Sequence, residues 1–251
     1  MRNIIICEGS TDYALLQYFM RTAYGWDDSK ITILGNDSHF AMKRTLQKNG
    51  NTLTIAGAGG CSKIPSCVER VLEVNNISQS TEESFQKIVI IIDRDEVGTE
   101  EAFIEKLNAC LDSQSVQIVE GIENDKWIKG HYRNSRGKKI EFLLLLLVIP
   151  FETTGALETF LLEAIAQKDV YDANIIAQCN SFIDNIDPQE RYLNKRRYKT
   201  KAKFDVFFSV RTAVSQFVER QNILKNIDWE NYFEVQESFK KLEELSISYE
   251  Y

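Results

Sequence analysis

Short apolar runs alternate along the chain with segments in which apolar residues recur at helical spacing. Four runs are apolar almost throughout, as in strands that are buried on both faces: residues 3–7, 52–56, 87–93 and 140–149. Weaker runs at 30–34 and 115–119 predict two further short strands. Helical spacing predicts helices at 13–24, 41–48, 62–74, 99–111 and 156–166. This alternation predicts an α/β fold with a central, mainly parallel sheet and helices on both faces.

The last third of the chain has a different pattern. Helical spacing continues there at 173–184, 203–218 and 229–245, and no strand-like run interrupts it. We therefore predict an α/β domain over residues 1–168 and a helical C-terminal part, residues 169–251, packed on it. Residues 121–139, which are rich in Lys and Arg, are predicted to form a loop or hairpin within the first domain.

Composition narrows the class of protein. The run 142–150 is too short to cross a bilayer, and the apolar residues at the N-terminus reach Glu8 too soon for a signal peptide. The five cysteines are scattered and form no CxxC pair, and the chain has only two histidines. This pattern argues against a structural zinc site. We expect reduced thiols in a cytoplasmic protein that has no membrane partner.

Charge is distributed unevenly in a chain of net charge −7. Residues 126–139 and 193–203 contain no acid and hold twelve of the 30 Lys and Arg, which leaves 18 such cations against 37 acids elsewhere. Each run alone could be a solvated loop, whereas the two together could bind a polyanion. For that second interpretation we expect both runs on the same side as the acidic site described below. The predicted nucleic-acid contacts are Lys126, Lys129, Arg133, Arg136, Lys138, Lys139, Arg196 and Arg197.

Acidic residues follow two of the predicted strands. Glu8 comes directly after the first strand, and Asp93 and Asp95 close the strand at 87–93. In an open α/β sheet the carboxyl ends of parallel strands form the binding edge. Carboxylates that converge in a crevice repel one another and need a compensating cation, and their oxygens suit Mg²⁺ or Mn²⁺.

Two motifs carry a resemblance to a known family. The sequences IIICEG at residues 4–9 and IIIDRD at residues 90–95 resemble the Toprim family, which is shared by topoisomerases, primases and some nucleases. The resemblance implies a Rossmann-like sheet. It also implies that Glu8 is a metal ligand or general acid/base, and that Asp93 and Asp95 bind metal.

Further motifs are similar to the OLD-type nuclease branch of that family. Asp12 lies in EGSTD and Glu158 lies in GALE, and the resemblance implies that both help to hold a second metal ion. It also implies a lysine late in the domain, for which Lys201 and Lys203 are the candidates. OLD proteins carry an ATPase segment before the Toprim part, and we expect none here. A separate ATPase or sensor protein is therefore an expected partner.

Together these observations predict an endonuclease that depends on Mg²⁺ or Mn²⁺, with two ions, and acts on DNA or RNA, with DNA the favoured substrate. The resemblance implies a prokaryotic antiviral defence effector. The alternative is a non-catalytic or regulatory Toprim-like module that binds nucleic acid or nucleotide. Convergence of the carboxylates around space for two cations favours the nuclease, because the binding module needs only a basic surface.

Overall fold

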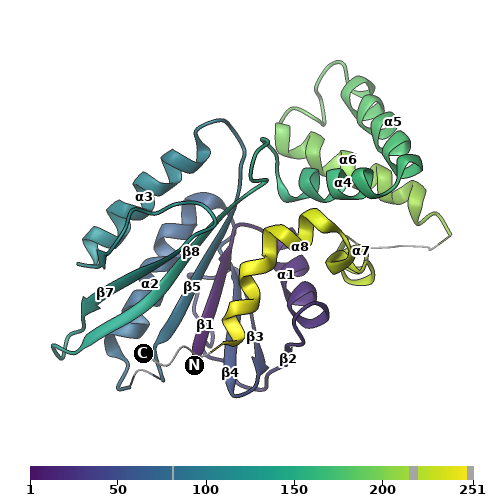
Figure 1. The fold of residues 1–251 in the computed structure, drawn as a ribbon. Coiled ribbons are helices and arrows are strands. Elements are labelled where there is room, and N and C mark those ends of the chain that lie inside the picture. Colours follow the sequence, from purple (N-terminus) through teal and green to yellow (C-terminus); the bar gives the residue numbers. More distant parts are fainter. Residues whose placement is uncertain (81, 215–219, 248–251) are drawn as a thin grey trace.

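The computed structural model describes residues 1–80, 82–214 and 220–247 (Figure 1). Its centre is one eight-stranded sheet with the strand order β2-β3-β4-β1-β5-β8-β7-β6. The strands are β1 (Arg2–Cys7), β2 (Asp27–Asp28), β3 (Met42–Lys48), β4 (Asn51–Gly57), β5 (Phe85–Asp93), β6 (Gln117–Ile118), β7 (Trp127–Arg133) and β8 (Lys139–Ile149). The predicted α/β class is confirmed.

The four central strands β4, β1, β5 and β8 are parallel, whereas β2, β3, β7 and β6 pair antiparallel at the two sides. A mainly parallel sheet is therefore correct only for the centre. The central strands are mostly apolar because helices cover both of their faces. The outer β7 alternates between buried and exposed residues, which is typical of a strand with one solvated face.

The helices form two layers and a cap. They are α1 (Ser10–Thr22), α2 (Ile64–Ile77), α3 (Thr99–Ser113), α4 (Leu157–Lys168), α5 (Val170–Ile186), α6 (Arg196–Arg211), α7 (Arg220–Asn226) and α8 (Phe233–Phe239). Figure 1 shows α2 and α3 on one face of the sheet and α1 and α8 on the other, with α4, α5 and α6 grouped beyond the carboxyl ends of the strands. No helix in the described ranges is long and apolar enough to cross a membrane.

Successive residues of each central strand enter different cores, since side chains alternate across a sheet. In β5, Ile88 and Ile90 pack with α2 and α3, while Val89 and Ile91 pack with α1, α4 and the C-terminal segments. The core on the side of α1 and α4 also contains Phe204 of α6. The C-terminal helices therefore share a hydrophobic core with the sheet.

Residues 41–48 form strand β3 and not the predicted helix. A two-residue turn, Asn49-Gly50, joins β3 to β4, and both residues have positive φ, 48° and 77°. An Asn-Gly pair between two strand-forming segments is a strong hairpin signal, because the mirror-image turn needs positive φ at both positions. Residues 30–34, predicted as a short strand, have no regular structure.

Of the helices predicted in the C-terminal part, 173–184 is confirmed as part of α5, whereas the other two are shifted or broken. The helix predicted at 203–218 is α6, which begins at Arg196 and ends at Arg211, and residues 215–218 of that prediction lie outside the described residues. The helix predicted at 229–245 is divided into two 3₁₀ segments, Trp229–Asn231 and Lys240–Ser246, on either side of α8. All five cysteines are free thiols, which agrees with the expected reduced state.

Three side chains at the amino edge of the sheet hold the C-terminal segment by its backbone. Asn3 of β1 donates to the carbonyl of Leu245 at 2.7 Å, and Asn51 of β4 donates to that of Ser246 at 3.0 Å. The ammonium group of Lys87 on β5 donates to the carbonyls of residues 244 and 247. We call Asn3, Asn51 and Lys87 the C-terminal clasp. Burial lowers the pKa of Lys87 to about 8.

The clasp predicts a measurable loss of stability. Asn51→Ala leaves the carbonyl of Ser246 without its donor, so the free energy of unfolding should fall by about 1–3 kcal/mol. Asn185→Ala is the matched control, because that amide bonds a backbone carbonyl of its own helix on the exposed face of α5. Urea unfolding should show a change of no more than about 0.5 kcal/mol for the control. Equal midpoints for the two variants would contradict the assigned role of the clasp.

Candidate active site

The predicted carboxylates line one pocket at the carboxyl edge of the sheet. Glu8 follows β1 and Asp93 ends β5, so the parallel pairing of these strands places both at the same edge. The pocket has a volume of about 530 Å³. Its lining residues are Glu8, Gly9, Ser10, Thr11, Asp12, Met42, Gly59, Gly60, Asp93, Asp95, Ala156, Glu158, Arg196, Arg197, Thr200 and Lys201. The prediction that Glu8, Asp93 and Asp95 share one rim is confirmed.

Local hydrogen bonds orient three of the carboxylates. The first turn of α1 places Asp12 where its Oδ2 accepts from the backbone N–H of Gly9 at 2.7 Å. Asp93 Oδ1 accepts from the backbone N–H of Leu157 at 2.9 Å, which joins β5 to the start of α4. The hydroxyl of Thr11 donates to Glu158 Oε1 at 2.9 Å, which joins α1 to α4. These bonds tie the start of α1, the end of β5 and the start of α4 together around the pocket.

A glycine turn encloses Glu8 from the side of β4. The backbone N–H groups of Gly59 and Gly60 both donate to the Glu8 carbonyl, at 3.0 and 2.9 Å. The φ angles of 80° and 136° at these two residues favour glycine. Glu8 Oε2 is buried and accepts no hydrogen bond in the described part of the protein. An orphaned carboxylate oxygen is costly unless a ligand satisfies it.

Burial and crowding of the acids raise the pKa values of their carboxyl groups. Burial first, and then the charges of Glu158 and Glu8, raise the pKa of Asp12 to about 7, although the hydrogen bond from the Gly9 N–H acts to lower it. Burial first, and then the charges of Asp12, Glu8 and Glu158, raise the pKa of Asp93 well above its usual value. The pKa of Glu8 is raised for the same two reasons, with Asp95 as the leading charge. The site therefore disfavours full ionisation unless positive charge is added.

Helix α6 supplies cations to the opposite side of the pocket. Successive residues of an α-helix are rotated by about 100°, so Arg196 and Thr200 form a ridge along α6. Arg197 and Lys201 lie on the pocket side of this ridge. Arg196 approaches Asp95, with 3.8 Å between Nη1 and Oδ1. The second basic run thus lies beside the carboxylates, as predicted.

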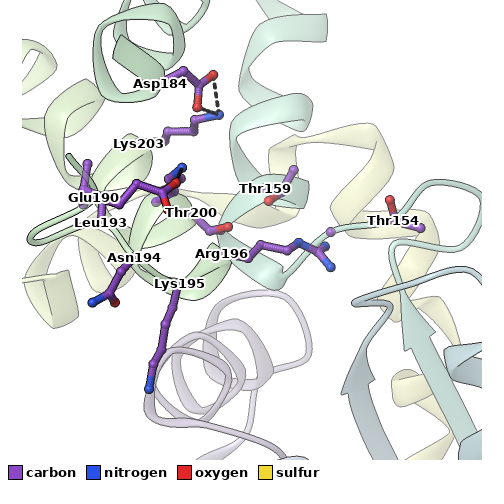
Figure 2. A pocket seen from close by; sticks show the side chains of 12 residues that line it. Thr154, Thr159, Asp184, Glu190, Leu193, Asn194, Lys195, Arg196, Thr200 and Lys203 are labelled. Atoms are coloured by element: carbon purple, nitrogen blue, oxygen red, sulfur yellow. Dashed lines mark hydrogen bonds and ion pairs between the residues drawn. The ribbon is translucent and has the colours of Figure 1, made fainter. Parts of the chain in front are cut away.

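The two candidate lysines have different positions. Lys201 lines the pocket and makes no ion pair with a described residue. Lys203 is on the other side of the ridge, where its Nζ lies 2.8 Å from Asp184 Oδ1 on α5. Figure 2 shows Lys203 turned toward Asp184 and away from Arg196. The structure therefore selects Lys201 as the lysine of this pocket.

The first basic run lies elsewhere. Residues 127–133 and 139–149 form the β7–β8 hairpin, and Arg133 pairs with Lys139 at the end of β8 opposite to Ile149. Ile149 is the residue beside Asp93. Ten residues at about 3.3 Å each separate Lys139 from that edge. The prediction that Arg133, Arg136, Lys138 and Lys139 lie on the same side as the carboxylates is wrong. β8 begins beside these basic residues and ends beside the carboxylates, so the two groups lie at opposite ends of the strand.

The remaining two basic residues of this run do not line the pocket. Lys126 forms ion pairs with Glu120 at 2.9 Å and with Glu123 at 3.0 Å. Lys129 pairs across the hairpin with Leu143, six residues before the carboxyl edge at Ile149. Residues 121–139, predicted as a loop or hairpin, thus hold one strand of the hairpin, β7, whose partner is β8.

Sequence reasoning missed two hydroxyl residues of the pocket. Thr11 and Thr200 both line the pocket, but between charged neighbours they read as a helix cap and a spacer. Arg94, between Asp93 and Asp95, does not line the pocket: it bonds Glu100 at 2.6 Å and the Pro150 carbonyl at 2.7 Å. It thereby fixes the segment that leads from β8 to α4.

No group of three or more His, Cys, Asp or Glu side chains within the described ranges is arranged so that it could hold a metal ion. The donor set of the pocket is nevertheless purely oxygen, which suits a hard cation. The unsatisfied Glu8 Oε2 gives one buried oxygen free for such a ligand. By donor chemistry the residues fit Mg²⁺ or Mn²⁺. A common coordination sphere requires the carboxylates to draw together.

The fold and pocket define a mixed α/β protein with an acidic site at the carboxyl edge of its sheet. The chain belongs to the DUF3226 family, described as proteins of unknown function, which matches residues 2–242. A hypothetical protein from Pyrococcus horikoshii OT3 is similar over 97% of this chain and 98% of its own, with 15% identity and a TM-score of 0.49.

Other similar structures share less with this chain. A lactoylglutathione lyase from Agrobacterium tumefaciens covers 57% of this chain and 91% of its own, with 7% identity and a TM-score of 0.17. A putative glyoxalase family protein from Bacillus anthracis covers 58% and 94%, with 10% identity and a TM-score of 0.18. No curated protein matches the chain.

Proposed function

We propose that the acidic pocket is the active centre of a Toprim-type nuclease that hydrolyses phosphodiester bonds with Mg²⁺ or Mn²⁺. The observation that carries this proposal is the composition of one pocket. Glu8, Asp12, Asp93, Asp95 and Glu158 face a site that α6 lines with Arg196, Arg197 and Lys201. Acids alone repel a phosphate and bases alone cannot hold a cation, whereas both together accommodate a phosphate and its metal ions.

The carboxylates would hold the cations, with Glu8 and Asp93 at the centre of the set and Asp12, Asp95 and Glu158 around them. Bound metal supplies Lewis acidity and lowers the pKa of a coordinated water. Of these residues, Asp12 and Glu158 are almost completely buried, and Asp95 is the most exposed. This gradient runs from the interior to the mouth of the pocket. Two cations would bind at successive positions along this gradient.

The chain's own residues perform the remaining work. Arg197 and Lys201 bind the non-bridging oxygens of the phosphate, and their positive charge stabilises the additional negative charge of the transition state. The raised pKa of Glu8 makes its carboxyl group a better proton acceptor than an ordinary glutamate, so Glu8 is suited to transfer a proton to or from the reacting oxygens. The hydrogen bonds from Gly9, Leu157 and Thr11 keep the other acids in position.

The runner-up is a regulatory module that binds nucleic acid or nucleotide without cleaving it. One specific observation favours it: the described carboxylates do not form a ready metal-ligand group. In that case the basic residues of α6 bind the phosphate. The acids would then confine it to the outer part of the pocket.

A cleavage assay separates the two functions. Purified protein is incubated with supercoiled plasmid, single-stranded DNA and RNA, each with Mg²⁺, Mn²⁺ or EDTA. The nuclease proposal predicts cleavage with either ion, none in EDTA, and faster cleavage of DNA than of RNA. Binding to these substrates without cleavage in any metal condition would support the regulatory module and reject the nuclease.

A further inference from the structure

A second cavity lies on the other side of the α6 ridge from the acidic pocket. Its volume is about 460 Å³, within the usual range for ligand pockets. Figure 2 shows the residues that line it: Thr154, Gly155, Thr159, Asp184, Glu190, Leu193, Asn194, Lys195, Arg196, Lys199, Thr200 and Lys203. Arg196 and Thr200 line both cavities, so the two are adjacent across a single helical ridge.

The charge of this cavity differs from that of its neighbour. Lys199 is held by Glu190 at 2.9 Å, and Lys203 is held by Asp184 at 2.8 Å. Both ion pairs lie within the wall of the cavity. The Lys203 pair fixes α6 to α5, and the Lys199 pair fixes α6 to the loop that precedes it. Lys195 makes no ion pair with a described residue, and its ammonium group lies 5.8 Å from the ring centre of Tyr198.

The lining thus carries four cations against two acids, whereas the acidic pocket carries five acids against three cations. Three threonine hydroxyls add donors and acceptors, at positions 154, 159 and 200. A cavity of this composition favours a polar anion. Opposite charge in adjacent cavities also favours a ligand that bears several phosphates, one of them beside the cations of the acidic pocket.

We propose that the second cavity binds the phosphate that flanks the scissile one, so that the substrate strand crosses α6 over Arg196 and Thr200. This inference rests on the proposed nuclease function, because it assigns the acidic pocket to the scissile phosphate. Arg196 lies between the two phosphates and contacts both. Lys195 and the hydroxyls of Thr159 and Thr200 receive the flanking phosphate and its sugar. The substrate class is therefore a polynucleotide strand and not an isolated phosphodiester.

The test uses the charge reversal Lys195→Glu, because Lys195 lines the second cavity and not the acidic pocket. Lys138→Glu is the matched control: it is an equal charge change at an exposed lysine of the β7–β8 hairpin, at the opposite end of the sheet. Binding of a short fluorescein-labelled single-stranded oligonucleotide is measured by anisotropy in EDTA at several salt concentrations. Hydrolysis of the same oligonucleotide and of bis(p-nitrophenyl) phosphate is then measured with Mn²⁺.

For Lys195→Glu we expect about tenfold weaker binding of the oligonucleotide and a log–log salt slope that is flatter by about 0.7. Lys138→Glu should change the affinity by less than about twofold, because it lies far from the strand path. The kcat/KM of Lys195→Glu should fall at least about fivefold more for the oligonucleotide than for bis(p-nitrophenyl) phosphate, which has no flanking phosphate.

Three outcomes overturn the inference: equal affinities for the two variants, an equal loss on both substrates, or no binding of oligonucleotide by the wild type. The equal loss would place Lys195 at the reacting phosphate. A failure of the nuclease function gives a different result. The wild type would then bind the oligonucleotide in a manner that depends on Lys195 and would hydrolyse neither substrate with Mn²⁺.

Discussion

Asp93→Asn should lower metal-dependent cleavage by at least about 100-fold while the protein stays folded. The amide keeps an oxygen that can accept the hydrogen bond from the Leu157 N–H, so the junction of β5 and α4 is preserved. It removes the negative charge that a cation needs. Glu8→Gln should have an effect of similar size. Single-turnover cleavage with Mn²⁺ at saturating protein measures both.

Stability provides the second readout for these variants. Thermal unfolding in EDTA should show equal or higher stability for Asp93→Asn than for the wild type, since one acid leaves a cluster of repelling charges. The matched control is Asp112→Asn, which neutralises an exposed acid on α3. Cleavage by Asp93→Asn at the rate of that control would mean that the pocket is not the active centre.

The two lysines of α6 should differ sharply when each is replaced with Met. Lys201→Met should reduce the single-turnover rate at saturation by about 10–100-fold, and the affinity by less, if Lys201 stabilises charge in the transition state. Lys203→Met should reduce that rate far less. Its main effect should be the loss of a partly exposed ion pair with Asp184, worth about 0.2–1 kcal/mol.

Each lysine variant is the control for the other, because both remove one charge from the same helix two residues apart. Rates at saturating and subsaturating protein separate affinity from chemistry. Urea unfolding of the two variants tests the ion pair. A larger rate loss in Lys203→Met than in Lys201→Met would overturn the assignment of Lys201 to the pocket.

The acidic side of this site is predictable from the sequence because the apolar runs show where each buried strand ends. An apolar run such as 87–93 identifies a buried strand, and the carboxyl ends of adjacent parallel strands must share an edge. The order of residues alone therefore places Glu8 and Asp93 together. Asp12 follows Glu8 by one helical turn, and Glu158 opens the next helix after β8. Asp12 and Glu158 meet the other two acids because both helices begin at the same edge of the sheet.

The basic side was harder to predict, for two physical reasons. The direction of β7 relative to β8 decides where Arg133 lies, and the antiparallel hairpin carries it to the remote edge. Residues 196–203 are dominated by charge, so their apolar periodicity is too weak to mark the start of α6. The packing of Phe204, Phe207 and Phe208 in the core fixes that helix in the orientation that brings Lys201 to the acids.

The C-terminal clasp has a consequence for biosynthesis. A ribosome releases β1, β4 and β5 long before it releases residues 244–247, so Asn3, Asn51 and Lys87 wait without their carbonyl partners while the intervening chain is made. The amino edge of the sheet can close only when that segment arrives. A nascent chain that stalls before residue 244 would leave this edge open to other polypeptides, which makes the emergence of this short segment the step that secures the fold.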